Sequence, residues 1–171
     1  MNKTNILLID DQDIFGRSSE VNGNVSPDVL RGEIINAQDM FLRDILGDEL
    51  YFKILEDFDN NALTGIYLDM FPGITDVVIF RTIQRAMLPL TKQITNKGIQ
   101  TGSSDFSQSA SDSAMWTHYN RYKRDAEFYE RRLFNFLKEN KDDIPEYTKE
   151  SDDINPRKDK NDPGAGTIKM I

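Results

Sequence analysis

The feature that most limits how this chain can fold is a long amphipathic segment towards its C-terminal end. Apolar and aromatic side chains recur four and three residues apart over three heptads, with Arg, Lys and Glu between them, at Met115, Tyr119, Tyr122, Ala126, Tyr129, Leu133 and Phe136. The pattern predicts a helix from Asp112 to about Asn140, about 28 residues and about 42 Å long. Three shorter helices would not cover that length, so we expect part of it to need a neighbour.

Two more helices are predicted near the N-terminal end. Ser26 followed by Pro27 is typical of a helix start, because proline at the first helical position loses no backbone hydrogen bond. Apolar positions then recur at helical spacing until Gly47, which supplies a left-handed stop. Asp48 is placed to cap a second helix, which we expect to end at Asn60.

The middle of the chain is predicted to hold a connection, a helix and a projection. Residues 63–73 contain two glycines and a proline and suggest a long connection. A third helix is expected from Thr75 to about residue 95, with either a kink or two abutting segments at Pro89, because proline removes a backbone donor. Residues 96–110 are rich in Gly and Ser and suggest a projecting loop or hairpin.

Both ends of the chain are expected to be polar arms. Residues 1–26 hold one short apolar run, Ile6 to Ile9, which suggests an extended arm with one strand. Residues 141–171 carry many charges and two late prolines, which is typical of a tail that a partner orders. The predicted fold is therefore mainly α: a bundle of about four helices over residues 27–140, with one long C-terminal helix, a projecting loop or hairpin, and extended N- and C-terminal arms.

The composition excludes several kinds of active site. The chain has no cysteine and one histidine, His118, which rules out disulfides, thiolate zinc sites and cysteine nucleophiles. It has no glycine-rich nucleotide loop, and its longest apolar runs are far shorter than a membrane span. We therefore expect no cofactor, no metal and no membrane contact, in a protein made and kept in a cytoplasm.

One segment pair resembles an enzyme-like domain. The paired acids after Asn5–Ile9 and the segment around Asp69 resemble the start and the phospho-acceptor segment of response-regulator receivers. A receiver needs alternating strands and helices, however, and two helices fill the interval between these segments. We therefore interpret the acids after Ile9 as a solvated strand end.

Charge is divided unevenly along the chain. Residues 1–70 hold 5 bases and 14 acids, whereas residues 71–137 hold 9 bases and 6 acids. A chain with unlike halves can offer complementary surfaces to a copy of itself, and such head-to-tail contacts close into rings when the rotation allows it. The alternative is that both signs only solvate separate helix faces.

Several segments together resemble the small head-to-tail connector proteins of tailed bacteriophages, most closely the adaptor or ring proteins of crAss-like and related phages. These segments are Ile34–Gln38 leading into Ile45–Tyr51, then Ile94–Gly98 with its Ser-rich loop, and Tyr122–Tyr129 continuing to Asn140. The likeness lies in their order and spacing and covers about residues 27–147.

The resemblance implies a structural virion protein without catalytic residues. It implies a ring, expected to have twelve copies, that lies below the portal protein at the head-tail junction, extends the DNA channel and docks neighbouring neck or tail ring proteins. Packaged DNA would pass through without specific binding, since binding would need clustered Lys and Arg. Alternative roles are another neck or tail-completion protein, or a small cytosolic helical binding adaptor.

Candidate interface residues follow from the charge division. We expect acidic positions on the first two helices to meet basic positions on the next copy, because Arg pairs bidentately with carboxylates. The acids are Asp39, Asp44, Asp48 and Glu49, and the bases are Arg81, Arg85, Arg124, Arg131 and Arg132. In the projecting loop, Lys97, Ile99 and Phe106 are candidates for contact with the portal or the tail.

Overall fold

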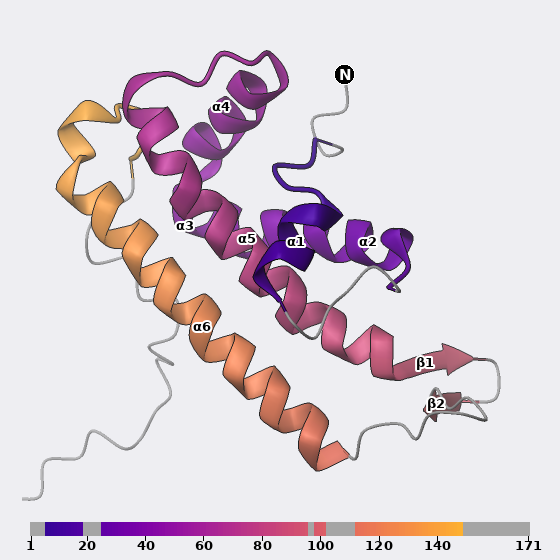
Figure 1. Cartoon of the computed structure of the whole chain (residues 1–171). Coiled ribbons are helices and arrows are strands. Elements are labelled where there is room, and N and C mark those ends of the chain that lie inside the picture. The colour runs from indigo at the N-terminus through magenta and orange to yellow at the C-terminus, as the bar shows by residue number, and fades with distance from the viewer. Residues whose placement is uncertain (1–5, 19–24, 96–97, 102–111, 149–171) are drawn as a thin grey trace, which may run out of the picture.

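The computed structural model describes residues 6–18, 25–95, 98–101 and 112–148, which form a mainly helical bundle (Figure 1). In chain order the elements are α1 (Asp11–Arg17), α2 (Pro27–Ala37), the π-helical η2 (Gln38–Leu42), α3 (Arg43–Leu46), α4 (Asp48–Asp59), α5 (Gly65–Thr91), β1 (Lys92–Thr95), β2 (Gly98–Thr101), α6 (Asp112–Glu139) and the 3-10 turn η3 (Lys141–Asp143). The predicted mainly α bundle with a long C-terminal helix is confirmed.

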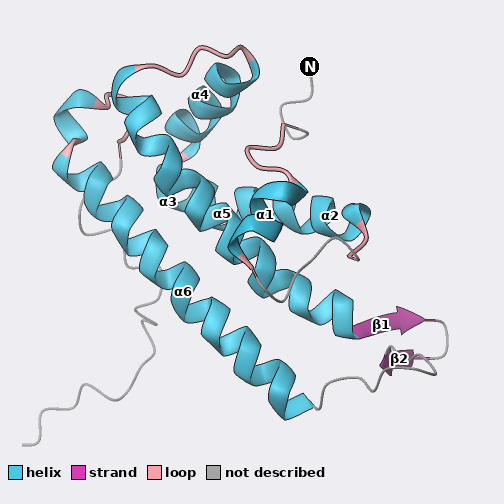
Figure 2. Ribbon diagram, viewed as in Figure 1, coloured by secondary structure: helices cyan, strands magenta, loops and turns pink. Residues whose placement is uncertain are grey.

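Helix α5 is the centre of the bundle. It packs against α6 along much of its length, and α2 and η2 also pack on it (Figure 2). The Phe80 ring of α5 stacks on the Tyr129 ring of α6, with centroids 4.7 Å apart. Tyr122, Ala126 and Leu133 of the predicted seam are buried. Because α5 has 27 residues and α6 has 28, α6 finds a partner of its own length within the chain.

The predicted connection at residues 63–73 is wrong over most of its length, since α5 already begins at Gly65 and continues through Pro72. Thr75 does not cap a helix: its hydroxyl donates to the Pro72 carbonyl, 3.0 Å away, inside α5. Proline in a helix interior costs about 3 kcal/mol, but the stretch also buries Met70 and Ile74. Burial of these apolar side chains outweighs the local preference.

Residues 92–101 form a small antiparallel hairpin at the end of α5. Strands β1 and β2 pair in the register Ile94 with Ile99, and they extend beyond the helical body in Figure 1. The prediction that the third helix reaches about residue 95 is wrong, because α5 continues through Pro89 but ends at Thr91, and Lys92–Thr95 form β1. The predicted loop or hairpin at residues 96–110 begins as a hairpin, with β2 at Gly98–Thr101, and residues 102–111 lie outside the described residues.

The first helical segment contains an unexpected π-helical turn. The predicted helix from Pro27 to Gly47 is present, but η2 interrupts it at Gln38. The wider turn lets the neighbouring side chains Ala37 and Gln38 both point inwards, where both are buried. Gly47 ends this segment at φ 78 as predicted. Asp48 does not cap α4, because it is already helical and accepts a hydrogen bond from Arg43 Nε at 2.8 Å.

The N-terminal segment is packed on the core and is not the predicted extended arm with a strand. Residues 6–10 are neither helix nor strand, and α1 follows them. The acids that we interpreted as a solvated strand end form a capping box, in which Asp10 and Asp13 each accept from the other's backbone N–H. The buried Gln38 amide donates to the Ile6 carbonyl at 2.9 Å and accepts from the Leu8 N–H at 2.8 Å. It therefore holds the backbone of this segment in place.

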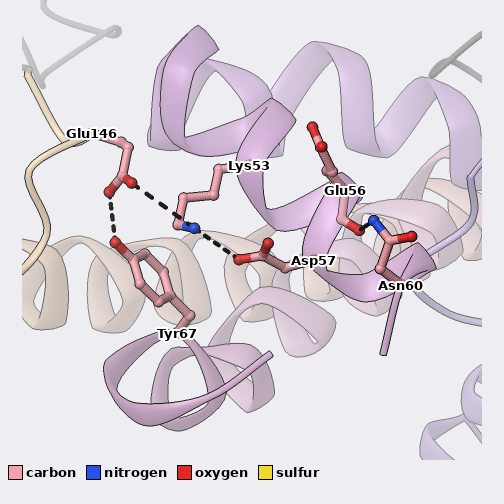
Figure 3. A network of polar contacts seen from close by, with 6 residues as sticks. All are labelled: Lys53, Glu56, Asp57, Asn60, Tyr67 and Glu146. Atoms are coloured by element: carbon pink, nitrogen blue, oxygen red, sulfur yellow. Dashed lines mark hydrogen bonds and ion pairs between the residues drawn. The ribbon is translucent and has the colours of Figure 1, made fainter. Parts of the chain in front are cut away.

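The beginning of the predicted C-terminal tail is also part of the core. Ile144 and Tyr147 are buried after α6 ends. Figure 3 shows the polar contacts beside them: Tyr67 donates to Glu146 Oε2 at 2.6 Å, and Lys53 Nζ lies 4.0 Å from Glu146 Oε1. Residues 141–148 are thus fastened to α4 and α5, while residues 149–171 lie outside the described part of the chain.

Candidate subunit interface

The four predicted acidic positions lie on three consecutive helical elements: Asp39 on η2, Asp44 on α3, and Asp48 and Glu49 on α4. Asp39 is half-buried and accepts a hydrogen bond from the Tyr51 hydroxyl at 2.8 Å, whereas Asp44, Asp48 and Glu49 are exposed. Burial raises the pKa of Tyr51, and the neighbouring Asp39 carboxylate adds to the rise. Asp39 therefore has a role within the subunit, and the other three acids face outwards.

The exposed charges on these helices have a single sign. Every exposed ionisable side chain from η2 to α4 is acidic, and we call this set the acidic edge: Asp44, Asp48, Glu49, Glu56 and Asp59. The two bases in the same helices, Arg43 and Lys53, are half-buried and paired with Asp48 and Asp57. The acidic edge is therefore a surface of uniform charge sign.

The exposed charges on α6 have the opposite sign. Among the described residues of α6, six bases are exposed and Glu139 is the single exposed acid. We call the six bases the basic face: Arg121, Lys123, Arg124, Arg131, Arg132 and Lys138. Three of the predicted interface residues, Arg124, Arg131 and Arg132, belong to it. Arg124 and Arg131 lie opposite the seam that packs on α5, and on the same side as each other because they are seven residues apart. Arg132 lies beside the seam, with its guanidinium 5.9 Å from the centroid of the Tyr129 ring.

Arg81 is not available for contact with another copy, contrary to our expectation. Its side chain is 1% exposed, and its Nε and Nη2 donate to the two Glu130 oxygens at 2.5 and 2.7 Å. Nη1 donates to Gln84 at 2.5 Å, and the guanidinium lies 4.3 Å from the centroid of the Phe41 ring. Arg81 thus joins η2, α5 and α6 in the centre of one subunit.

Arg85 is also used within the chain. Its Nε donates to Glu33 of α2 at 2.6 Å, and both side chains are partly buried. Part of the charge complementarity between the acidic first third and the basic middle is therefore satisfied between α2 and α5 in the same molecule. Arg85 was predicted to contact another copy because the sequence shows which residues are near it on its own helix. The sequence does not show which residue of another helix faces it, and that residue is Glu33 of the same chain.

Exposed aromatic rings accompany the basic face. Phe128 is 50% exposed, lies edge-on to Tyr129 at 5.3 Å between ring centroids, and has the Arg132 guanidinium 5.9 Å from its own centroid. Trp116, nearer the start of α6, is 48% exposed. A shallow hollow on the same helix is lined by Thr117, Asn120, Lys123, Arg124 and Glu127. Arginine and large aromatic residues are the types that dominate binding energy in protein interfaces.

The N-terminal segment adds a further cation close to this face. Arg17 of α1 forms an ion pair with Asp76 of α5, and the Ser18 and Tyr122 hydroxyls are 3.0 Å apart. Burial raises the pKa of Asp76, while Arg17 and Arg132 act in the opposite direction. The Asp76 carboxylate thus has one arginine of α1 and one arginine of α6 near it.

The loop candidates are mostly outside the described part of the chain. Lys97 and Phe106 are not among the described residues, and Ile99 is placed in β2 by its backbone alone. Their expected contacts with portal or tail stay predictions.

Neither a candidate metal site nor a membrane-spanning helix is found in the described ranges. His, Asp and Glu do not gather there in a group of three that could hold a metal ion. Among the helices of the same ranges, none has both the length and the apolar character needed to cross a membrane.

A family model described as a family of unknown function, DUF6712, matches residues 42–156, which is more than half of the chain. The chain belongs to DUF6712. The matched range contains α3, α4, α5, the hairpin, α6 and the segment at residues 141–148, so the DUF6712 region includes the whole acidic edge and the whole basic face. No curated protein and no solved structure matches the chain.

Proposed function

We propose that this DUF6712 protein is a structural virion protein, a head-to-tail connector subunit that assembles below the portal and docks the tail. The observation that carries the proposal is the division of exposed charge: a uniformly acidic edge from α3 to α4 and a basic, aromatic-bearing face on α6. Helix α5 lies between α6 and the N-terminal helices, so one copy can engage two neighbours at once.

Two other features support this role. The hairpin β1–β2 extends beyond the helical body at one end of the α5–α6 pair, as expected for an element that contacts the next component (Figure 1). Of the segments that resemble phage connector proteins, Ile34–Gln38 lies on α2 and η2, Ile45–Tyr51 on α3 and α4, and Tyr122–Tyr129 on α6. No step of the proposal needs a cofactor or a reaction.

The experiment is localisation in purified virus particles. An antibody raised against residues 112–140 should label virions at the junction of head and tail, because that is where a connector ring lies. Particles emptied of DNA should be labelled equally, since no DNA contact is invoked. Absence of the protein from purified virions, with the protein recovered from the host cytoplasm instead, would refute the role and favour a small helical binding adaptor.

A further inference from the structure

We propose that the acidic edge of one copy docks on the basic face of α6 of the next, with Phe128 at the centre of the contact and Met40 of the neighbour facing it. This inference rests on the proposed function and names the two surfaces through which copies would meet. The partner is a second copy of this chain, and each copy contributes one surface to each of two interfaces.

Charge complementarity is the first argument. The acidic edge has five exposed acids and no exposed base, and the basic face has six exposed bases beside Glu139, the single exposed acid among the described residues of α6. If two copies met through the same surface, charges of the same sign would face each other, which costs free energy and slows association. Contact between unlike surfaces brings Arg124 and Arg131 towards carboxylates that arginine can bind bidentately.

Exposed apolar side chains on both surfaces are the second argument. Phe128 lies within the basic face and is 50% exposed, and Met40, four residues before Asp44, is 57% exposed. Interfaces typically combine a small apolar centre with a charged rim, and thioether–aromatic contacts are favourable. Each surface therefore has an exposed apolar side chain with charged side chains near it. This arrangement fits an interface with an apolar centre and a charged rim.

Geometry is the third argument. The acidic edge is carried by α3 and α4 and the basic face by α6, so the contact joins unlike patches. The two patches belong to separate parts of the bundle: α6 packs along α5, and α4 contacts α5 through the stacked rings of Phe58 and Phe71. Contacts of this kind continue from copy to copy and close into a ring if the rotation allows it, whereas a contact between identical patches stops at a dimer. The arrangement is thus the one a ring subunit needs.

The test is complementation between two charge-reversed chains. Variant A carries Arg124→Glu and Arg131→Glu on the basic face, and variant B carries Asp44→Lys and Glu49→Lys on the acidic edge. Each variant alone should be monomeric by native mass spectrometry, because reversed charges meet like charges. An equal mixture of A and B should recover an assembly in which the two chains alternate, since the reversed face of A then meets the reversed edge of B.

The control variant carries Arg31→Glu and Lys141→Glu, two exposed bases outside both surfaces whose reversal changes the net charge as much as variant A does. It should assemble like the wild type. Circular dichroism of all three variants should match the wild type, because every replaced side chain is exposed.

Three results would overturn the inference: assembly of A or B alone, a mixture of A and B that stays monomeric, or a wild-type chain that stays monomeric at low salt. Labelling at the head-tail junction combined with any of them would leave the connector role standing and reject these two surfaces. Recovery of the assembly in the mixture, with no labelling of virions, would support these two surfaces and reject the connector role.

Discussion

The Arg81–Glu130 pair should respond very unequally to removal of its two members. Arg81 is 1% exposed and Glu130 is 18% exposed, and two hydrogen bonds of 2.5 and 2.7 Å join them. Replacing Glu130 with Leu leaves a fully buried guanidinium that has only Gln84 and the Phe41 ring beside it. Breaking a buried pair in this way costs about 3–5 kcal/mol.

Replacing Arg81 with Met should cost less. The remaining Glu130 carboxylate can still be hydrated, and Met fills much of the vacated volume, so we expect a loss of about 1–2 kcal/mol. The double variant, Arg81→Met with Glu130→Leu, should be more stable than Glu130→Leu alone, because no buried charge is left without a partner.

The assay is urea unfolding followed by circular dichroism, with the free energy of unfolding extrapolated to water for the wild type and the three variants. A larger loss for Arg81→Met than for Glu130→Leu would refute the reasoning. So would a double variant whose loss equals the sum of the two single losses, because that would mean that the pair is not coupled.

Three further predictions concern the fastened ends of the chain. Gln38→Leu removes both hydrogen bonds to the N-terminal backbone, so hydrogen exchange at the Leu8 amide should accelerate at least tenfold while α6 amides stay protected. Tyr147→Phe should leave the free energy of unfolding unchanged or raise it slightly, because the buried Tyr147 hydroxyl has no hydrogen-bond partner among the described residues. Tyr67→Phe should lower the free energy of unfolding by about 1–2 kcal/mol, because it removes a hydrogen bond to a carboxylate; equal effects in urea unfolding would contradict this. Burial and the neighbouring Glu146 raise the pKa of Tyr67 to about 12, so Tyr67 keeps its proton to a higher pH in the folded state than in the unfolded chain. The stabilisation from this hydroxyl should therefore be lost as pH rises from about 10 through 12. An ultraviolet titration that shows Tyr67 ionising with the other tyrosines would contradict this prediction.

The helical fold was predictable from periodicity wherever one apolar stripe faced one partner. Helix α6 and the segment from Pro27 to Gly47 were found in this way. Local signals were misleading where packing outweighed them: Pro72 indicated a connection, yet it lies inside α5 because the residues around it are buried. Helix α1 was missed because it has only seven residues and a single buried side chain, Ile14, which is too short for a periodic pattern.

The candidate interface was predictable in part. The division of charge along the chain indicated two unlike surfaces, and Arg124, Arg131 and Arg132 lie on one of them. The same division could not separate charges that face solvent from those that face another helix, so Arg81 and Arg85 were assigned to an interface although they pair with Glu130 and Glu33. Phe128 and Met40 carried no signal of their own, because a single apolar residue on a polar face is common.

The ends of the chain show a second limit of sequence reasoning. Residues 10–26 and 141–148 are rich in polar side chains, which favoured the prediction of arms. A few buried side chains hold these segments against the core instead. At the C-terminal side they include Ile144 and Tyr147, and Glu146 between them accepts a hydrogen bond from Tyr67. The sequence alone does not identify these residues, because it does not show the surface against which they pack.

The central claim is that one copy completes another through unlike surfaces, and cross-linking tests it most directly. The chain has no cysteine, so Glu49→Cys and Arg124→Cys introduce a unique pair, one on each surface. With a short bismaleimide at low salt, the account predicts covalent oligomers that increase stepwise to a closed ring, and no cross-linked species when only one of the two cysteines is present. Failure of the double variant to form covalent oligomers would contradict the account.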